Sequence, residues 1–355
     1  MIEVDGSMME GGGQILRMAV TYSAVLGVPV RVTKIRAGRG RPGLRPQHLT
    51  TLRAVAEMCR AGTKGLNIGS MEVEFRPGSP RGGNYDVDIG TAGSVSLLLQ
   101  CLAPIATFSG SPSKLTIRGG TNVRWSPPMM ILDNVIWGAF RAMGFEGGLA
   151  VRREGFYPRG GGIVDVDISP VEGLMPLHIQ SPGVIRGVRG ISLCGRLPRH
   201  VAERQEKSAR RVLEEEGFET EIITRVASGR EAPFSPGSAV GLWVDSRPPM
   251  FMGSSALGER GKPAERVGEE AAVSLVEQIG TRAAVDMYTA DHLVLWCSLA
   301  SGESVYSASS LTPHTRTAVE IARIFTEAEI NLEGRRNGLA LIRCRGIGLE
   351  NRGLS

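Results

Sequence analysis

The sequence predicts the α/β (α+β) class: a large domain of three repeated helix–strand–helix–strand–strand units, with an inserted smaller α/β domain. Apolar segments of helical period alternate with short strand-like runs over most of the chain. Two pairs of segments also echo each other, 80–89 with 158–168 and 88–99 with 286–297. Either echo alone could arise by chance, but the two together favour a repeated unit.

The repeated units follow from helix starts at small residues or proline and from alternating strands that end at glycine turns. In the first unit we expect two helices and three strands, at 13–26, 46–61, 28–37, 66–76 and 85–90. In the second we expect the same set, at 92–108, 127–144, 114–119, 148–153 and 162–169. In the third we expect it at 290–300, 314–328, 304–308, 330–333 and 338–345.

The stretch 184–280 breaks this pattern. It is predicted to hold four strands, a charged helix and a second helix, at 184–194, 219–227, 238–245, 250–256, 200–216 and 264–280. We therefore expect residues 1–183 and 281–355 to form a large catalytic domain and residues 184–280 to form an inserted small α/β domain.

The composition limits the classes of protein to which this chain can belong. The chain has 355 residues and a net charge of +5, and 36 of its 41 basic residues are Arg. Arg grips phosphate with two parallel hydrogen bonds, although genome composition or thermal adaptation also explains such a bias. The five Cys form no CxxC pair, which is typical of reduced core thiols in an intracellular, cytoplasmic protein. The uncharged stretch 89–113 contains Pro, Gly and Gln, so we expect a buried helix and no membrane span.

Two loops precede predicted helices and carry candidate phosphate ligands. In the first, Glu10 and Arg17 flank three glycines, so backbone N–H groups could approach an anion, Glu10 could bind a metal and Arg17 a phosphate. A simple glycine turn is the alternative. The second has four Arg within ten residues and no acid, with Arg36 and Arg39 at its start and Gln47 just after it. It suits a phosphate or an RNA end, or it is a solvated basic loop.

Further candidates lie at other helix starts. Gln100 interrupts an apolar helix face, where an amide needs a partner unless it faces solvent. Pro127 opens a helix and could stack on a base. Tyr288 could do the same or pack in the core, and Asp291 is a good N-cap. His314 begins the second helix of the third unit, where a neutral imidazole could attack phosphorus, although most such histidines are surface or capping residues.

Together these segments resemble the RNA 3′-terminal phosphate cyclase family over nearly the whole chain, in order. The matching segments are Asp5–Gly6, Glu10–Arg17, Ile35–Arg39, Pro42–Leu44, Gln47–Leu49, Gly119–Asn122, Pro127–Pro128, Gly155–Gly162, Pro198–Glu203, Tyr288, Asp291 and His314. Each motif is weak alone, and together they are highly specific. The family's fold, three repeated α/β units plus an insert, agrees with the prediction above.

The resemblance implies an activity. ATP would adenylate a histidine and release pyrophosphate, and the AMP would pass to an RNA 3′-phosphate. The neighbouring 2′-OH would then attack that phosphate and leave a 2′,3′-cyclic phosphate and AMP. The partners implied are ATP and RNA with a 3′-terminal phosphate, with Mg²⁺ or Mn²⁺ as the metal. Whether the chain forms a homo-oligomer stays open.

The resemblance also implies residue roles. His314 would be the adenylated nucleophile and Glu10 a metal ligand. Phosphate would be bound by a polar set, namely Arg17, Arg36, Arg39 and Gln47. The nucleotide would be held by a second set, namely Gln100, Pro127, Tyr288, Asp291 and His292, with Pro127 and Tyr288 on the two faces of the adenine. Position 292 departs from the family pattern, because many members carry Gln there.

Two other classes of protein compete with this interpretation. A non-catalytic cyclase-like RNA-binding protein of ribosome biogenesis would lack the adenylated histidine, whereas His314, Glu10 and the pair Arg36 and Arg39 are all present. An enolpyruvyl transferase would need no adenine-stacking residues. Walker loops and the Lys-x-Asp-Gly motif of lysine-adenylating ligases do not occur in the sequence, so a histidine intermediate is the natural alternative.

Overall fold

Four sheets of four strands each organise residues 1–334 and 338–354, the part of the chain that this computed structural model describes. Three of the sheets share one topology, with the spatial order first, second, fourth, third strand. Their first two strands pair in parallel and their other neighbours are antiparallel. The predicted fold class, with three repeated units, is therefore confirmed.

The three units contain the following elements. The first consists of β1 (Ile2–Asp5), α1 (Gly13–Leu26), β2 (Val30–Thr33), α2 (Pro46–Met58), β3 (Gly62–Lys64) and β4 (Val73–Arg76). The second consists of β5 (Gly83–Asp88), α3 (Val95–Thr107), β6 (Ser113–Gly119), α4 (Met129–Ile131), a π-helical turn (Leu132–Ile136), α5 (Trp137–Arg141), β7 (Glu146–Arg153) and β8 (Gly162–Ser169). The third consists of β9 (His178–Ile179), α8 (Thr289–Leu299), β14 (Glu303–Ala308), α9 (Pro313–Phe325), β15 (Glu329–Gly334) and β16 (Ala340–Arg345).

Each unit begins with a strand, whereas the prediction has each unit begin with a helix. The strand expected at 85–90 was placed at the end of the first unit, but β5 pairs in parallel with β6 and opens the second unit. Because no strand is predicted at 2–5, the predicted boundary between the first and second units falls one element too late. Four-residue β1 is too short to show a clear alternation, and this is why its pattern was missed.

One of the two sequence echoes is not a repeat. Segment 80–89 leads into β5 and segment 158–168 into β8, and both strands belong to the same sheet, on either side of β6. A glycine turn followed by an alternating strand is a local pattern and says nothing about position in a sheet. The other echo does relate equivalent elements, because it leads into α3 in the second unit and α8 in the third.

The segment between β9 and α8 forms a separate sheet with its own helices. Its elements are β10 (Val184–Gly195), α6 (Arg199–Glu215), β11 (Thr220–Ala227), a 3-10 turn (Gly229–Glu231), β12 (Gly237–Arg247), β13 (Gly253–Leu257) and α7 (Ala264–Gly280). It interrupts the first strand of the third unit, since β9 pairs with Val305 and Tyr306 in the middle of β14 and Val285 pairs with Ala308 at the end of β14. The boundaries at 183/184 and 280/281 stay a prediction.

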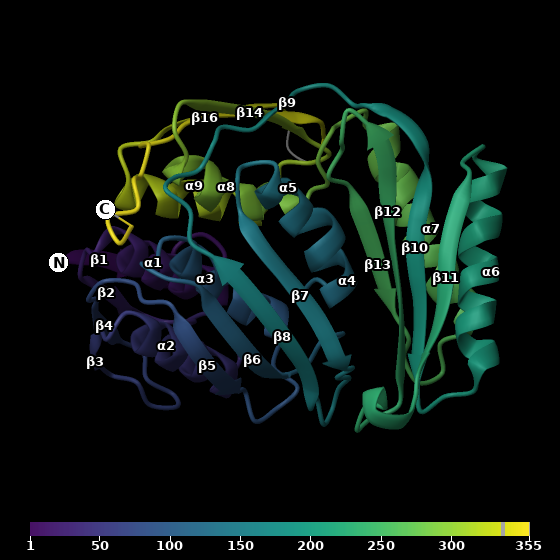
Figure 1. Ribbon diagram of the computed structural model, residues 1–355, viewed down its shortest axis with the longest axis horizontal. Coiled ribbons are helices and arrows are strands. Elements are labelled where there is room, and N and C mark those ends of the chain that lie inside the picture. Colours follow the sequence, from purple (N-terminus) through teal and green to yellow (C-terminus); the bar gives the residue numbers. More distant parts are fainter. Residues whose placement is uncertain (335–337, 355) are drawn as a thin grey trace.

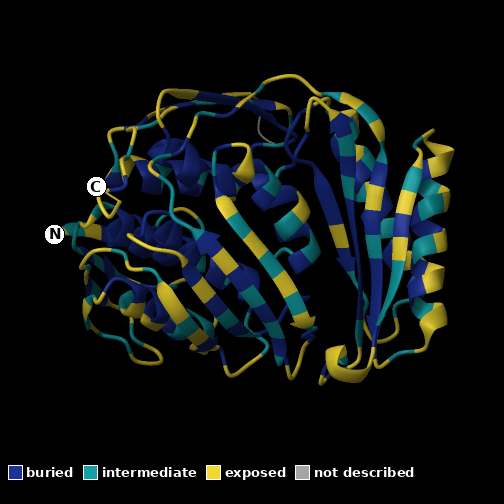
Figure 2. Ribbon diagram, viewed as in Figure 1, coloured by how far each residue is buried: buried dark blue, intermediate teal, exposed yellow. Residues whose placement is uncertain are grey.

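The helices of the three units lie between the sheets (Figure 1). Helix α1 is central: it contacts α2, α3 and α9, and twelve of its fourteen residues are buried. The main core runs through all three units, and a second apolar cluster lies between α6, α7 and the sheet of the inserted segment. Figure 2 shows this burial, with the outer face of α6 exposed. Both termini lie at the same side of the molecule (Figure 1).

Two expectations from composition concern the interior. All five cysteines are buried and free, which confirms the prediction of core thiols. The stretch 89–113 holds α3, and within residues 1–334 and 338–354 no helix is long and apolar enough to cross a membrane.

Candidate active site

The starts of α1 and α9 meet, although they lie about 300 residues apart in the sequence. Gln14, in the first turn of α1, donates a hydrogen bond from Nε2 to the carbonyl of His314, at 3.1 Å. Helix α9 begins there because Pro313 fits its first turn and the Thr312 side chain accepts from the N–H of Thr315. Two helix N-termini, each with free N–H groups, therefore face one region, and such ends attract anions.

His314 is held through one nitrogen. Its Nδ1 lies 2.9 Å from Oε1 of Gln14 and 2.9 Å from Oε2 of Glu10. Both of these atoms are acceptors, so Nδ1 carries the proton and Nε2 keeps a lone pair. The His314 side chain is 54% exposed, which leaves the ring open to a substrate. An imidazole oriented in this way could act as a nucleophile.

Arg17 brings a buried positive charge to the same place. The residue is 8% exposed, and its Nε donates to Oε1 of Gln100 at 3.1 Å. Burial lowers the pKa of the Arg17 guanidinium, but arginine stays protonated in proteins. A Cβ on Gly13 would lie 2.9 Å from Nη1 of Arg17, so the glycine lets the guanidinium reach the start of α1. Burying a charge is costly, and an incoming phosphate would offset that cost.

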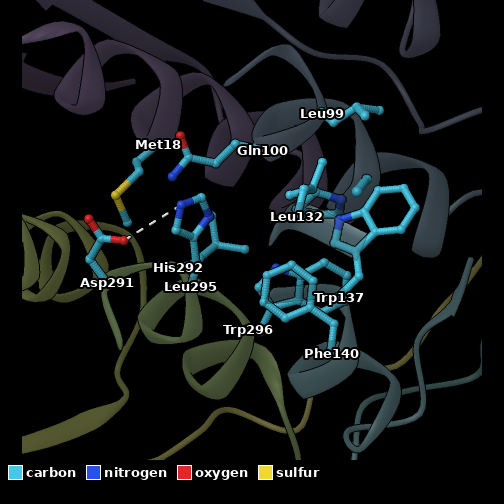
Figure 3. A pocket seen from close by; sticks show the side chains of 12 residues that line it. Met18, Leu99, Gln100, Leu132, Trp137, Phe140, Asp291, His292, Leu295 and Trp296 are labelled. Atoms are coloured by element: carbon cyan, nitrogen blue, oxygen red, sulfur yellow. Dashed lines mark ion pairs between the residues drawn. The ribbon is translucent and has the colours of Figure 1, made fainter. Parts of the chain in front are cut away.

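Asp291 and His292 lie near Gln100 (Figure 3). They line a small pocket together with apolar side chains, among them Leu132 and Trp296. Burial, helped by the nearby charges of Asp286 and Glu10, raises the pKa of Asp291 to about 8. Burial together with Arg17 and His314 lowers the pKa of His292 to about 4.

Both side chains are therefore neutral at pH 7. The 3.7 Å contact between Oδ1 of Asp291 and Nε2 of His292, dashed in Figure 3, joins two uncharged groups. Oδ1 of Asp291 is buried and makes no hydrogen bond with the residues that the structure describes. A neutral carboxyl group can donate as well as accept, so it could bind a hydroxyl or amino group of a ligand.

Substitution of Asp291 by Asn should change how stability depends on pH. The pKa of Asp291 in the folded protein, about 8, is higher than the ordinary value of 3.8 for an aspartate. Its contribution to stability is thus present below the unfolded pKa and is lost as the pH rises through about 8. Asn cannot ionise, so Asp291→Asn should raise the Tm more at pH 9 than at pH 5, as measured by thermal unfolding. An equal shift at both pH values would contradict the raised pKa.

The basic loop lies beside the glycine loop. The guanidinium of Arg39 donates to the carbonyl of Glu10 at 3.1 Å, and Arg39 itself is exposed. Arg36 instead holds its own loop, since its Nη1 donates to the carbonyls of Arg41 and Gly43. Burial and the neighbouring arginines lower the pKa of Arg36. A loop in which like charges are crowded together favours an anionic ligand.

Gln47 connects this loop to the second unit. Its Oε1 accepts a hydrogen bond from the N–H of Ser94, the N-cap of α3, at 3.2 Å. Pro127 and Tyr288 precede the first turns of α4 and α8, and both rings are accessible to solvent, Tyr288 to 58%. The adenine sandwich between these two rings stays a prediction.

Residues 8–332 match the family model "RTC: RNA 3'-terminal phosphate cyclase". The chain belongs to the RNA 3′-terminal phosphate cyclase family. It is 45% identical to an RNA 3′-terminal phosphate cyclase of Methanopyrus kandleri, over 98% of this chain and 99% of that protein. It is 44% identical to that of Desulfurococcus amylolyticus, with the same coverage, and 45% identical to that of Archaeoglobus fulgidus, over 94% and 98%.

Solved structures add little to this assignment. The enolpyruvyl transferase NikO from Streptomyces tendae is similar with a TM-score of 0.35 and 11% identity, over 99% of this chain and 49% of that one. A likeness this weak carries no argument about fold or activity.

Two residues of this cyclase-family site received no role from sequence reasoning. Gln14 is one, and its contact with His314 joins segments too distant for any local pattern to reveal. His48 is the other: its Nδ1 accepts from the N–H of Arg45 at 3.3 Å, and a Cβ on Gly13 would lie 2.6 Å from its Nε2. Burial, with Arg17 and Arg36 nearby, lowers the pKa of His48 to about 3, so a neutral ring supports the glycine loop.

Proposed function

We propose that this protein uses ATP to convert the 3′-terminal phosphate of an RNA into a 2′,3′-cyclic phosphate, through a covalent histidine–AMP intermediate. The observation that carries the proposal is the orientation of His314, whose Nδ1 faces Glu10 and Gln14, while Nε2 makes no hydrogen bond with the residues that the structure describes. Arg17 supplies a buried positive charge beside it. Membership of the cyclase family supports the same reaction.

The first step is attack by Nε2 of His314 on the α-phosphorus of ATP. A nitrogen–phosphorus bond forms as the bond to pyrophosphate breaks, and the ring becomes positively charged. The Glu10 carboxylate, 2.9 Å from Nδ1, stabilises that charge. Arg17 and the N–H groups at the starts of α1 and α9 stabilise the negative phosphate oxygens.

Two further steps complete the reaction. An oxygen of the RNA 3′-phosphate displaces the histidine from the AMP, which restores His314 and gives RNA–pp–A. The 2′-OH then attacks the phosphorus of the 3′-phosphate, loses its proton, and expels AMP. Arg36, Arg39 and Gln47 would bind the RNA phosphate, while Gln100, Pro127, Tyr288, Asp291 and His292 would hold the nucleotide. Reduced buried thiols fit a reaction in the cytoplasm.

One residue of this site could be a ligand of a divalent metal ion. In residues 1–334 and 338–354 no group of three or more His, Cys, Asp or Glu could hold an ion by protein ligands alone. Mg²⁺ and Mn²⁺ do not need three protein ligands, because they commonly bind one or two carboxylates together with substrate phosphates. Glu10 offers such a carboxylate, with its side chain 32% exposed. When bound, the metal would neutralise charge on the phosphate oxygens.

Substitutions at Glu10 should separate its two proposed roles. Glu10→Gln keeps an acceptor near Nδ1 of His314 but removes the negative charge, whereas Glu10→Ala removes both. We expect Glu10→Ala to lower self-adenylation about 100-fold or more, as loss of a single electrostatic contact to a transition state does. Glu10→Gln should keep more activity and need more metal. Equal metal dependence in Glu10→Ala and wild type would contradict the metal role.

The reaction is tested by its product. Purified protein is incubated with ATP, Mg²⁺ and an RNA whose 3′-terminal phosphate is labelled, and the end is then treated with phosphatase. Resistance of the label to phosphatase, dependent on ATP, is expected for a cyclic phosphate. A label that stays fully sensitive, with RNA bound, would favour the non-catalytic RNA-binding alternative.

A further inference from the structure

Two aromatic side chains project into solvent from neighbouring loops. Trp125 is 91% exposed and Tyr157 is 77% exposed. The loops are joined, because the N–H groups of Thr121 and Asn122 donate to the carbonyl of Gly155, at 2.9 Å and 3.1 Å. Asn122 and Phe156 also form a parallel bridge. Single exposed apolar residues are common, but here two large rings project from adjoining, hydrogen-bonded loops.

The backbone holds Trp125 outward at some cost. Its φ is +61°, in the left-handed region that large side chains seldom adopt. The loop is fixed on both sides of this residue, since Arg124 forms an ion pair with Glu259 of the inserted segment and Ser126 Oγ donates to the carbonyl of Val123. A strained conformation that leaves a Trp ring unpacked gains nothing for the core, which indicates a role in binding.

The two loops are linked to the proposed site. Gly160, three residues after Tyr157, packs against the backbone of Thr91 and Ala92, where a Cβ would lie 2.7 Å from both. That turn leads directly to Ser94, whose N–H donates to Gln47. In the sequence, Trp125 lies two residues before Pro127. The loops that carry the two rings are therefore connected to residues proposed to bind the RNA 3′-phosphate and the nucleotide.

The charge beside the rings is positive. Arg159 is exposed in the same loop as Tyr157, and its guanidinium lies 5.4 Å from the centre of the Phe234 ring of the inserted segment. Arg153 lies over the same ring at 4.1 Å. Aromatic rings interleaved with arginines are how proteins bind single-stranded nucleic acid, because bases stack on the rings and phosphates meet the cations.

We propose that Trp125 and Tyr157 form a stacking surface for the unpaired nucleotides that precede the RNA 3′-terminal phosphate. The inference rests on the function proposed above and adds the substrate class: RNA whose 3′ end is single-stranded. Stacking requires exposed base faces, so a 3′ end paired in a blunt duplex cannot use the surface.

Tryptophan fluorescence tests the contact directly. Of the four tryptophans, Trp137 and Trp296 are buried and Trp243 is partly buried, so a water-soluble quencher reports mainly on Trp125. A short single-stranded RNA with a 3′-phosphate should quench the emission and protect it from iodide. In Trp125→Phe this response should disappear. A wild-type response that persists in Trp125→Phe, or none in wild type at saturating RNA, would overturn the proposal.

Binding measurements give the energetic test. Trp125→Ala should weaken binding of the single-stranded RNA about tenfold or more, and Trp125→Phe less, because a smaller ring still stacks. Binding of a blunt duplex end should change little. Ile223→Ala, at an exposed apolar residue of β11, is the matched control and should bind as wild type. Equal weakening for both RNAs would overturn the proposal.

Self-adenylation without RNA is measured on the same preparations. Wild-type protein that takes up no AMP would contradict the proposed function. Wild-type protein that takes up AMP, together with unchanged RNA affinity in Trp125→Ala, would contradict only the stacking surface.

Discussion

His314→Ala should take up no AMP from α-labelled ATP, while the folded protein stays as stable as wild type. The imidazole is the proposed nucleophile, and without it the nitrogen–phosphorus bond cannot form at this position, so the loss should exceed about 1,000-fold. The fold should tolerate the change because the side chain is 54% exposed and Thr312 still caps α9. The measurement is a denaturing gel of labelled protein.

The control for this substitution is His292→Ala, because His292 is a second histidine whose charge environment includes His314. It lies in the pocket of Figure 3, buried and neutral, and its ring is not held by Glu10. His292→Ala should therefore keep the ability to take up label, with weaker use of ATP. Normal labelling of His314→Ala with loss in His292→Ala would assign the nucleophile to position 292.

Arg17→Met should abolish most of the activity and yet raise the Tm. The guanidinium is 8% exposed and its Nε contacts a neutral amide, Gln100, so its charge is costly in the ligand-free fold. Met fills a similar volume without that charge, and replacement of buried charges by apolar side chains is often stabilising. Loss of a charged contact to the phosphates should lower turnover about 100-fold or more.

Kinetics and thermal unfolding of the same preparation check this pair of effects. Arg31→Lys, at an exposed arginine that pairs with Glu72, is a control that should leave both quantities near wild type. A stable Arg17→Met protein with normal turnover would remove Arg17 from the site. A large fall in its Tm would show that the charge serves the fold.

The repeated architecture and the helix starts could be predicted from the sequence. Glycine, proline and capping residues mark those starts locally, so α1, α3 and α9 begin within three residues of the predicted positions. The short strands β1, β3 and β9 were missed because two to four residues carry no clear alternation. Without these strands the predicted boundaries between the units are misplaced. The echo of 80–89 with 158–168 was interpreted as a repeat for the same reason, although it is not one.

The candidate site was only partly predictable. Motifs identified the types of residue, but the orientation of His314 depends on Gln14 and Glu10, which only the folded chain brings to it. The neutral states of Asp291, His292 and His48 come from burial and from nearby charges, and no local pattern encodes either. The contact of His48 with the glycine loop could not be predicted for the same reason, because only the folded chain brings the two together.

The most direct test of the account is incubation of the wild-type protein with α-labelled ATP and Mg²⁺, without RNA, followed by denaturing electrophoresis and acid treatment. The account predicts a covalent AMP label that acid removes, as expected of a nitrogen–phosphorus bond, and that an RNA with a 3′-phosphate discharges. Folded protein that takes up no label would contradict a histidine–AMP intermediate, and so would a label that acid leaves in place.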